Sequence, residues 1–186
     1  ETFNVPTTIA RLRSPEFENG SELLGKTGFA VDQVICPEQT VTAYIRKLIE
    51  YPEALQVLEF AHGLVSLIAV RAVTGGPLVQ HSLSEIPKLV PNADMRIVAI
   101  YRQDAPLGEL GGATRIEPGD EVFVLAATEH IRTVLGALRT KDRPVRRIMV
   151  AGGGKVGLRL AREIGSSYQL KIIESSRQRC EYLVTQ

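Results

Sequence analysis

The sequence is short of the residues that mark a nucleic-acid surface. Aromatic residues make up 5% of its 186 residues, Trp is absent, and 22 Lys and Arg nearly balance 21 Asp and Glu for a net charge of +1. Binding to nucleic-acid phosphates needs clustered basic residues, and stacking on bases needs interleaved aromatic side chains. The sequence shows neither pattern, so we expect no nucleic-acid partner.

Long apolar runs and cysteines are also scarce. Runs such as Leu64 to Val70 stop far short of the roughly 20 residues that span a bilayer. Cys36 and Cys180 are too few and too far apart for a disulfide framework or a Cys-rich metal site, which suits a reducing cytoplasm. We expect Cys36, at the end of a strand, to be a small buried apolar residue.

What the sequence does have is an ordinary globular composition, with 44% apolar residues. Its length allows one large or two small domains. The chain opens at Glu1 without Met or a signal-like segment, and we expect it to be a central piece of a longer protein.

A glycine loop between an apolar strand and a helix is the most informative feature. The strand begins at Arg147, and Gly152, Gly154 and Gly157 follow it in the G-x-G-x-x-G spacing. In that motif the first glycine permits a tight turn, the second lets a pyrophosphate approach the backbone, and the third lets helix pack on strand. The helix N-terminus adds free N–H groups and the positive end of its dipole. The pattern predicts a nucleotide site.

An acid after the next strand strengthens this prediction. Leu170 to Glu174 reads as a second strand, and Glu174 lies about 20 residues beyond the loop, where a ribose hydroxyl is met. A carboxylate there favours NAD-type ribose over a 2′-phosphate. Lys155 lacks the Gly-Lys-Ser/Thr ending of a P-loop, so we expect a backbone cradle with Lys155 exposed. The alternatives are that the glycines serve packing alone and that Glu174 is a solvated strand end.

The first part of the chain reads as strand, strand and helix. Strands are predicted from Thr7 and over 28–36, and Pro15 marks a helix start. A helix from Glu38 to Tyr51 follows. Its apolar positions share one face, which we expect to pack across a subunit or lobe boundary: Val41, Ile45, Leu48 and Ile49.

The middle of the chain predicts a compact α+β module. Strands are expected at 55–60, 64–73 and 96–102, and the stretch 115–126 is expected to hold a turn at Pro118 to Asp120 that leads into another strand. A short helix at 84–89 is expected to be interrupted by Pro87, and Thr128 is expected to N-cap a helix that ends at Arg139. The polar linker 141–147 then predicts a domain boundary.

Three stretches together resemble the RCK (regulator of potassium conductance) family. Residues 32–52 resemble the crossover strand and helix of bacterial RCK domains, and 116–124 match the Ile-x-Pro-Gly-Asp-x-Val-x-Val pattern that ends their C-lobe. A new glycine loop after that lobe is similar to the tandem-RCK regulators of Trk-type potassium uptake. The resemblance implies α/β and α+β parts: the end of a Rossmann-like N-lobe with its crossover helix (1–52), an α+β C-lobe (53–140), and a linker with the start of a second Rossmann-like lobe (141–186).

The resemblance also implies a function without catalysis. It implies a cytoplasmic subunit, peripheral at the inner face of the membrane, that binds NAD(H) or else ATP or ADP. The subunit would form a homo-oligomer, a dimer or a tetrameric ring, beneath a TrkH-like membrane potassium channel or transporter subunit. Carried over by position, the phosphate loop is Gly152, Gly153, Gly154, Lys155, Val156 and Gly157. Glu174 is the ribose acid and Arg177 an adenine or phosphate contact. We expect the pocket to be incomplete in this chain.

Two other functions stay open at this point. An NAD-dependent oxidoreductase would use the middle module as its substrate domain, but hydride transfer needs a positioned acid or base, and no clustered His, Tyr-Lys or Cys-His pair is evident. The C-lobe could instead sense a cyclic dinucleotide through the loop Ala105 to Thr114. No metal site is expected, because the histidines lie on unrelated segments without ligand spacing: His62, His81 and His130.

Overall fold

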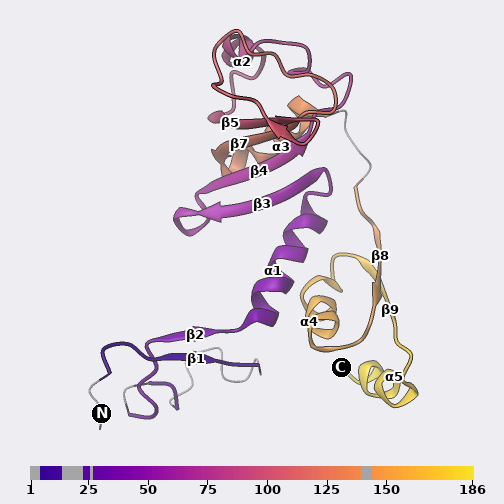
Figure 1. Cartoon of the computed structure of the whole chain (residues 1–186). Coiled ribbons are helices and arrows are strands. Elements are labelled where there is room, and N and C mark those ends of the chain that lie inside the picture. The colour runs from indigo at the N-terminus through magenta and orange to yellow at the C-terminus, as the bar shows by residue number, and fades with distance from the viewer. Residues whose placement is uncertain (1–4, 14–22, 26, 140–143) are drawn as a thin grey trace. The chain divides into compact units, whose positions relative to one another are not determined.

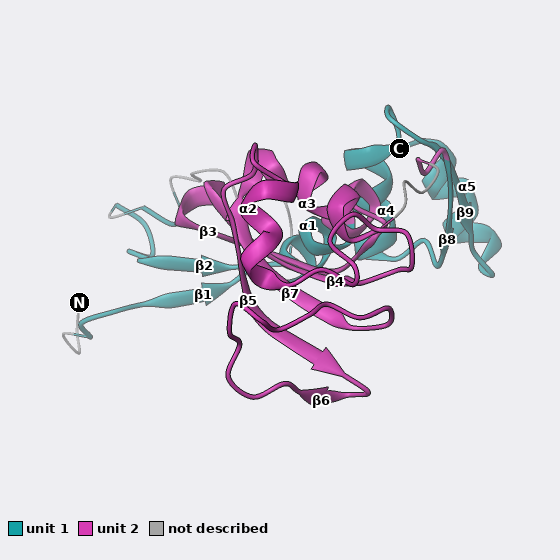
Figure 2. Cartoon of the chain, turned by 90° about the horizontal axis from the view of Figure 1, so that it is seen from above, with its two compact units in different colours: residues 1–45, 147–186 teal, residues 46–146 magenta. Residues whose placement is uncertain are grey.

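The chain forms two compact units. The computed structural model describes residues 5–13, 23–25, 27–139 and 144–186 (Figure 1). The predicted helix start at Pro15 and part of the predicted linker 141–147 lie outside the described residues. A flanking unit combines Glu1–Ile45 with Arg147–Gln186, and a middle unit spans Arg46–Arg146 (Figure 2).

The middle unit is built on one antiparallel sheet. Its strand order is β3-β4-β7-β5-β6, so neighbours in the sheet come from distant parts of the sequence. The strands are β3 (Ala54–Phe60), β4 (Val65–Arg71), β5 (Met95–Arg102), β6 (Ala105–Pro106) and β7 (Glu121–Ala127). The four longer strands occupy the stretches in which the sequence predicts strands.

One face of this sheet carries the core. Ile68 of β4 pairs with Val57 of β3 on one side and with Val124 of β7 on the other, and all three side chains are buried. Successive residues of a strand point to opposite faces, so this register places the buried residues together. Helix α3 (Ile131–Leu138) packs on the same sheet and buries Val134 and other apolar side chains.

The helix α3 begins differently from the prediction. The segment η4 (Thr128–His130) precedes it, and the N-cap is His130 without a side-chain hydrogen bond, so the predicted cap by Thr128 is wrong. The Thr128 hydroxyl lies 2.9 Å from the Ser66 hydroxyl instead. Ser66 is fully buried, so its hydroxyl needs a hydrogen-bond partner. The Thr128 hydroxyl is that partner and therefore does not cap the helix.

The short helix around Pro87 is continuous. Segment η3 (Leu83–Glu85) leads directly into α2 (Ile86–Leu89), with Pro87 in the first turn. A proline is tolerated there because the first N–H groups of a helix have no intrahelical acceptor. The predicted interruption by Pro87 is therefore wrong.

An ion pair between the buried Asp120 carboxylate and the half-buried Arg102 fixes the turn that precedes β7. Gly119 adopts φ +92°, and the Asp120 carboxylate accepts a 2.8 Å bond from the Glu117 N–H. Asp120 is 1% exposed and receives Nε and Nη2 of Arg102, each at 2.9 Å. This hydrogen bond to Asp120 raises the pKa of Arg102. The sequence predicts the turn, while the arginine that holds it comes from another strand, β5.

The flanking unit contains parallel strands. In its first part β1 (Ile9–Arg11) pairs in parallel with β2 (Gln33–Ile35), which is shorter than the predicted strand 28–36. The chain before β2 turns instead, with Ala30 at φ 50° and the Asp32 carboxylate accepting the Thr8 N–H at 2.7 Å.

Helix α1 (Pro37–Glu50) follows β2 and confirms the predicted helix. Its fully buried residue is Thr42, whose hydroxyl donates to the Glu38 carbonyl at 2.7 Å, whereas Val41 on the predicted apolar face is 46% exposed. Because the Thr42 hydroxyl donates to a carbonyl of the preceding turn, its burial leaves no unpaired hydrogen-bond donor.

The second part of the flanking unit alternates strands and helices. It runs β8 (Arg147–Ala151), α4 (Lys155–Ile164), β9 (Gln169–Ile173) and α5 (Arg177–Val184), with β8 and β9 in parallel. Together with the antiparallel middle unit, this confirms the predicted α/β and α+β class. Within the described ranges, no helix combines the length and apolarity that crossing a membrane requires.

Candidate nucleotide site

The glycine loop joins β8 to α4 with the geometry that its motif requires. Gly152 adopts φ +101°, a backbone conformation that residues with a side chain rarely adopt. The chain turns away from the strand at this residue. A Cβ on Gly157 would lie 2.2 Å from the Gly152 carbonyl oxygen, so only glycine allows the helix to pack this closely on the loop.

The N-terminus of α4 is open at this loop. Gly154 is the N-cap, and a Cβ placed on it would meet no atom within 4 Å. The first N–H groups of a helix lack intrahelical acceptors, and together with the dipole they attract anions. Lys155 is exposed, as expected, and Val156 is half-buried at the start of the helix.

Glu174 lies against this loop. It follows β9 directly, and its carboxylate accepts the N–H of Ser176 and the N–H of Gly153, each at 2.9 Å. These two bonds, the one from Ser176 first, lower the pKa of Glu174. The structure therefore brings together the loop and the acid that the sequence places about 20 residues apart.

Helix α5 covers the middle glycine of the loop. A Cβ on Gly153 would lie 2.2 Å from Leu183 Cδ1, and Arg179 Nε donates to the Gly153 carbonyl at 2.9 Å. The sequence pattern predicts a site role for neither Leu183 nor Arg179. Ser176, whose hydroxyl accepts the Arg179 N–H, is the N-cap signal that would have placed Arg179 in the first turn of α5.

Arg177 is exposed and pairs within its own helix. Its side chain is 93% exposed, and its Nε lies 3.2 Å from Glu181 one helical turn later. The arginine that reaches the loop is Arg179, two positions further along the same helix.

The remaining candidates are spread over the fold. Cys36 is 5% exposed, which confirms its predicted burial, and Cys180 is half-buried with its thiol 3.5 Å from the Glu174 carbonyl. His81 lies 3.4 Å from Glu85, and His130 Nδ1 accepts the Asp94 N–H. Among the described residues, no three His, Cys, Asp or Glu side chains gather as a metal site.

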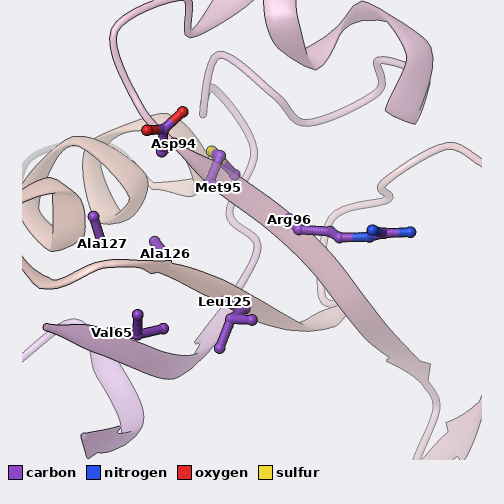
Figure 3. A pocket seen from close by; sticks show the side chains of 7 residues that line it. All are labelled: Val65, Asp94, Met95, Arg96, Leu125, Ala126 and Ala127. Carbon is purple, nitrogen blue, oxygen red and sulfur yellow. The ribbon is translucent and has the colours of Figure 1, made fainter. Parts of the chain in front are cut away.

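The middle unit has a hollow of its own, of about 290 Å³ (Figure 3). It lies between the start of β5 and the end of β7, and Asp94 and Arg96 are its charged residues. Figure 3 shows the Arg96 side chain extending away from Asp94. The loop Ala105 to Thr114 does not line this hollow.

Most of the chain is similar in sequence to known proteins. The TrkA-C domain family matches residues 67–139. The "Trk system potassium uptake protein TrkA" of Vibrio alginolyticus is 48% identical over 182 residues, which is 97% of this chain and 40% of that protein. The protein of the same name from Haemophilus influenzae is 38% identical, again over 97% of this chain and 40% of its own length.

A solved structure is similar as well. The RCK domain of GsuK matches with a TM-score of 0.48 at 15% identity, over 92% of this chain and 36% of that one. This chain spans about 40% of the length of the curated relatives named above. Residues 67–139 belong to the TrkA-C domain family, and along 97% of its length the chain is similar to the corresponding part of these TrkA proteins.

Proposed function

We propose that this chain is part of the cytoplasmic regulatory subunit of a Trk-type potassium uptake system. The subunit binds NAD(H), with ATP or ADP as the alternative, at the loop Gly152 to Gly157. Ligand binding controls potassium flux through a TrkH-like membrane subunit, at whose inner face the protein assembles as a dimer or tetrameric ring. The names of its relatives support the assignment to a Trk-type potassium uptake system. The contact between the Glu174 carboxylate and the glycine loop supports the choice of a nucleotide as the ligand.

The loop and Glu174 supply different contacts to a nucleotide. The free N–H groups at the start of α4 bind phosphate oxygens, and the open space over Gly154 lets those oxygens approach the backbone. The Glu174 carboxylate accepts hydrogen bonds from ribose hydroxyls and repels a 2′-phosphate. A glutamate is already ionised at neutral pH, so both effects operate there, and the lowered pKa of Glu174 extends them to more acidic conditions.

Regulation requires the ligand to distinguish two states of the assembly. A ligand that binds both states equally shifts no equilibrium, so NADH and NAD, or ATP and ADP, must differ in their preference. We assign the apolar positions of α1 to a subunit or lobe boundary that changes between the states. Sedimentation of Ile45→Asp tests this assignment, because an unchanged assembly state would remove α1 from the boundary.

Calorimetric titration of NAD, NADH, ATP and ADP tests the ligand site. Gly154→Asp places a carboxylate where the phosphates approach, and we expect the affinity to fall at least about tenfold. Gly108→Asp is the matched control, because its Cβ also meets no atom within 4 Å and it adds the same charge in the middle unit. Unchanged affinity in Gly154→Asp would remove the loop from the site.

A regulatory subunit of this kind carries out no catalysis, which distinguishes it from an oxidoreductase. Incubation with NADH and candidate carbonyl substrates, followed by absorbance, distinguishes the two. We expect a constant NADH absorbance; sustained loss that depends on the substrate would favour the enzyme.

A further inference from the structure

A histidine side chain holds the segment that leads into β5. The His130 ring nitrogen Nδ1 accepts a 3.1 Å hydrogen bond from the backbone N–H of Asp94, 36 residues earlier in the sequence. Asp94 immediately precedes β5, and His130 ends η4 and is the N-cap of α3. The bond therefore ties the start of β5 to the start of the helix that packs on the sheet. The His130 side chain is 26% exposed, so solvent reaches the ring.

This bond defines the protonation state of the ring. A backbone N–H can only donate, so Nδ1 must keep its lone pair and the ring proton must be on Nε2. An imidazolium ring carries a proton on both nitrogens and accepts no hydrogen bond. Protonation of His130 therefore places two donors against each other and removes the acceptor of the Asp94 N–H.

The neighbouring charges are placed differently from this acceptor. The Glu129 carboxylate lies 3.9 Å from Nε2, so it does not replace the acceptor that Nδ1 provides, and at 81% exposure its pairing with the ring is screened by solvent. Asp94 and Arg96 line the hollow at the start of β5, and Figure 3 shows their side chains extending apart. In α3, the Arg132 guanidinium lies 5.3 Å from the centre of the Tyr51 ring.

Loss of the histidine bond would act on one wall of the hollow. Asp94 also contacts β7, because its carbonyl accepts the Ala127 N–H at 3.3 Å. That distance is long for an N–H···O bond, so this contact alone holds Asp94 weakly. Asp94 and Ala127 both line the hollow, whereas the buried core lies between the sheet and α3 (Figure 3). The change should therefore be local.

We propose that His130 is a pH-dependent latch. The neutral ring fastens the Asp94 backbone at the hollow between β5 and β7, and the protonated ring releases it. Histidine side chains ordinarily change charge between about pH 5 and 8, so the latch opens in mildly acidic conditions. It goes beyond the proposed function, since it requires neither a nucleotide on the glycine loop nor a membrane partner.

NMR titration of the 186-residue chain from about pH 8 to about pH 5 tests the latch. At the upper end, the imidazole nitrogen spectrum should show the His130 proton on Nε2. The Asp94 amide shift should then change with the same midpoint as the ring. Protection of this amide from hydrogen exchange, relative to an unstructured peptide at the same pH, should fall about fivefold. The Ala127 amide should follow, and the core amides of Ile68 and Val124 should not.

Two substitutions separate the acceptor from the charge. His130→Asn carries an amide oxygen near the position of Nδ1 and does not titrate, so the Asp94 amide should stay protected throughout. His130→Gln extends to the position of Nε2 and lacks that acceptor, so the Asp94 amide should be released at every pH. His62→Asn is the matched control: it removes another histidine of the middle unit, at φ 55°, a conformation that Asn tolerates, and the titration should persist.

Three outcomes would each overturn the proposal. They are a proton on Nδ1 at the upper end of the titration, an Asp94 amide that does not respond when the ring titrates, and a response that persists in His130→Asn. An unchanged Ile68 amide in each variant shows that the fold is retained. Nucleotide affinity takes no part in these measurements, so a failure of the glycine loop as a ligand site would leave the result unaffected.

Discussion

The middle unit and the segment Arg147–Gln186 use their side chains differently. The middle unit gathers a cluster of buried apolar residues between its sheet and α3. In the segment, alternate strand residues stay exposed: Met149 of β8 is 65% exposed and Ile173 of β9 is 49% exposed. The segment instead brings backbone N–H groups and a carboxylate together at one loop. Stability therefore resides mainly in one region and the candidate ligand chemistry in the other.

The difference follows from how each sheet is covered. An antiparallel sheet is stable with one covered face, and α3 provides that cover in the middle unit. Parallel sheets in known proteins are usually covered on both faces. The β8–β9 pair thus depends more on close backbone packing, and Gly157 is the residue that permits it.

The largest effect should come from cutting a core side chain of the middle unit. Ile68 is fully buried in β4, and Ile68→Ala should lower the free energy of unfolding by about 4 kcal/mol through lost apolar burial and a cavity. Urea unfolding, followed through the hydrogen exchange of β4 amides, measures the change. Met149→Ala in the segment should change stability by less than about 0.5 kcal/mol. Similar losses in both variants would contradict the comparison.

The next effect concerns the ion pair that fixes the turn before β7. Arg102→Met leaves the buried Asp120 without its guanidinium partner and should cost about 3 kcal/mol in urea unfolding. The exposed pair Arg71–Glu121, at 3.9 Å, provides the control, since Arg71→Met should cost less than about 0.5 kcal/mol. Adding Asp120→Leu to Arg102→Met should restore part of the loss. No recovery would mean that the penalty does not come from the unpaired carboxylate.

A smaller and more local effect should follow from Gly157→Ala. The added methyl would lie 2.2 Å from the Gly152 carbonyl oxygen, so α4 or the loop must shift, at a cost of about 2 kcal/mol. Hydrogen exchange should show faster exchange in β8 and β9 and unchanged exchange in β4 and β7. Gly154→Ala is the control, because its Cβ has open space. Equal acceleration in both units would show that they unfold together.

The sequence predicts features that depend on local chemistry. The glycine spacing, the acid at Glu174 and the turn at Gly119 are all found in the structure because backbone conformation and strand order determine them. The errors have tertiary causes. Thr128 contacts Ser66 of a distant strand in place of capping its helix. Arg179 approaches Gly153 only because α5 folds back over the loop, and no local pattern specifies that contact.

The smallest expected effect concerns the pKa values of two carboxylates, one from each region, that accept hydrogen bonds from backbone N–H groups. Hydrogen bonds from the Ser82 hydroxyl and N–H lower the pKa of Glu85 to about 2, and bonds from Ser176 and Gly153 lower that of Glu174. Both contributions to stability are full above the ordinary value of 4.5 and are lost as the pH falls through each folded-state pKa.

Carboxyl chemical shifts followed by NMR measure both titrations. Ser82→Ala should raise the pKa of Glu85, whose largest cause it removes, and leave that of Glu174 unchanged. A nucleotide on the loop should shift Glu174 and not Glu85, because a ribose hydroxyl would give the carboxylate a new donor while nearby phosphates disfavour its charge. If Glu174 titrated at 4.5 without ligand, its contact with Gly153 would be absent in solution, and the loop would lose the acid that connects it to a ribose.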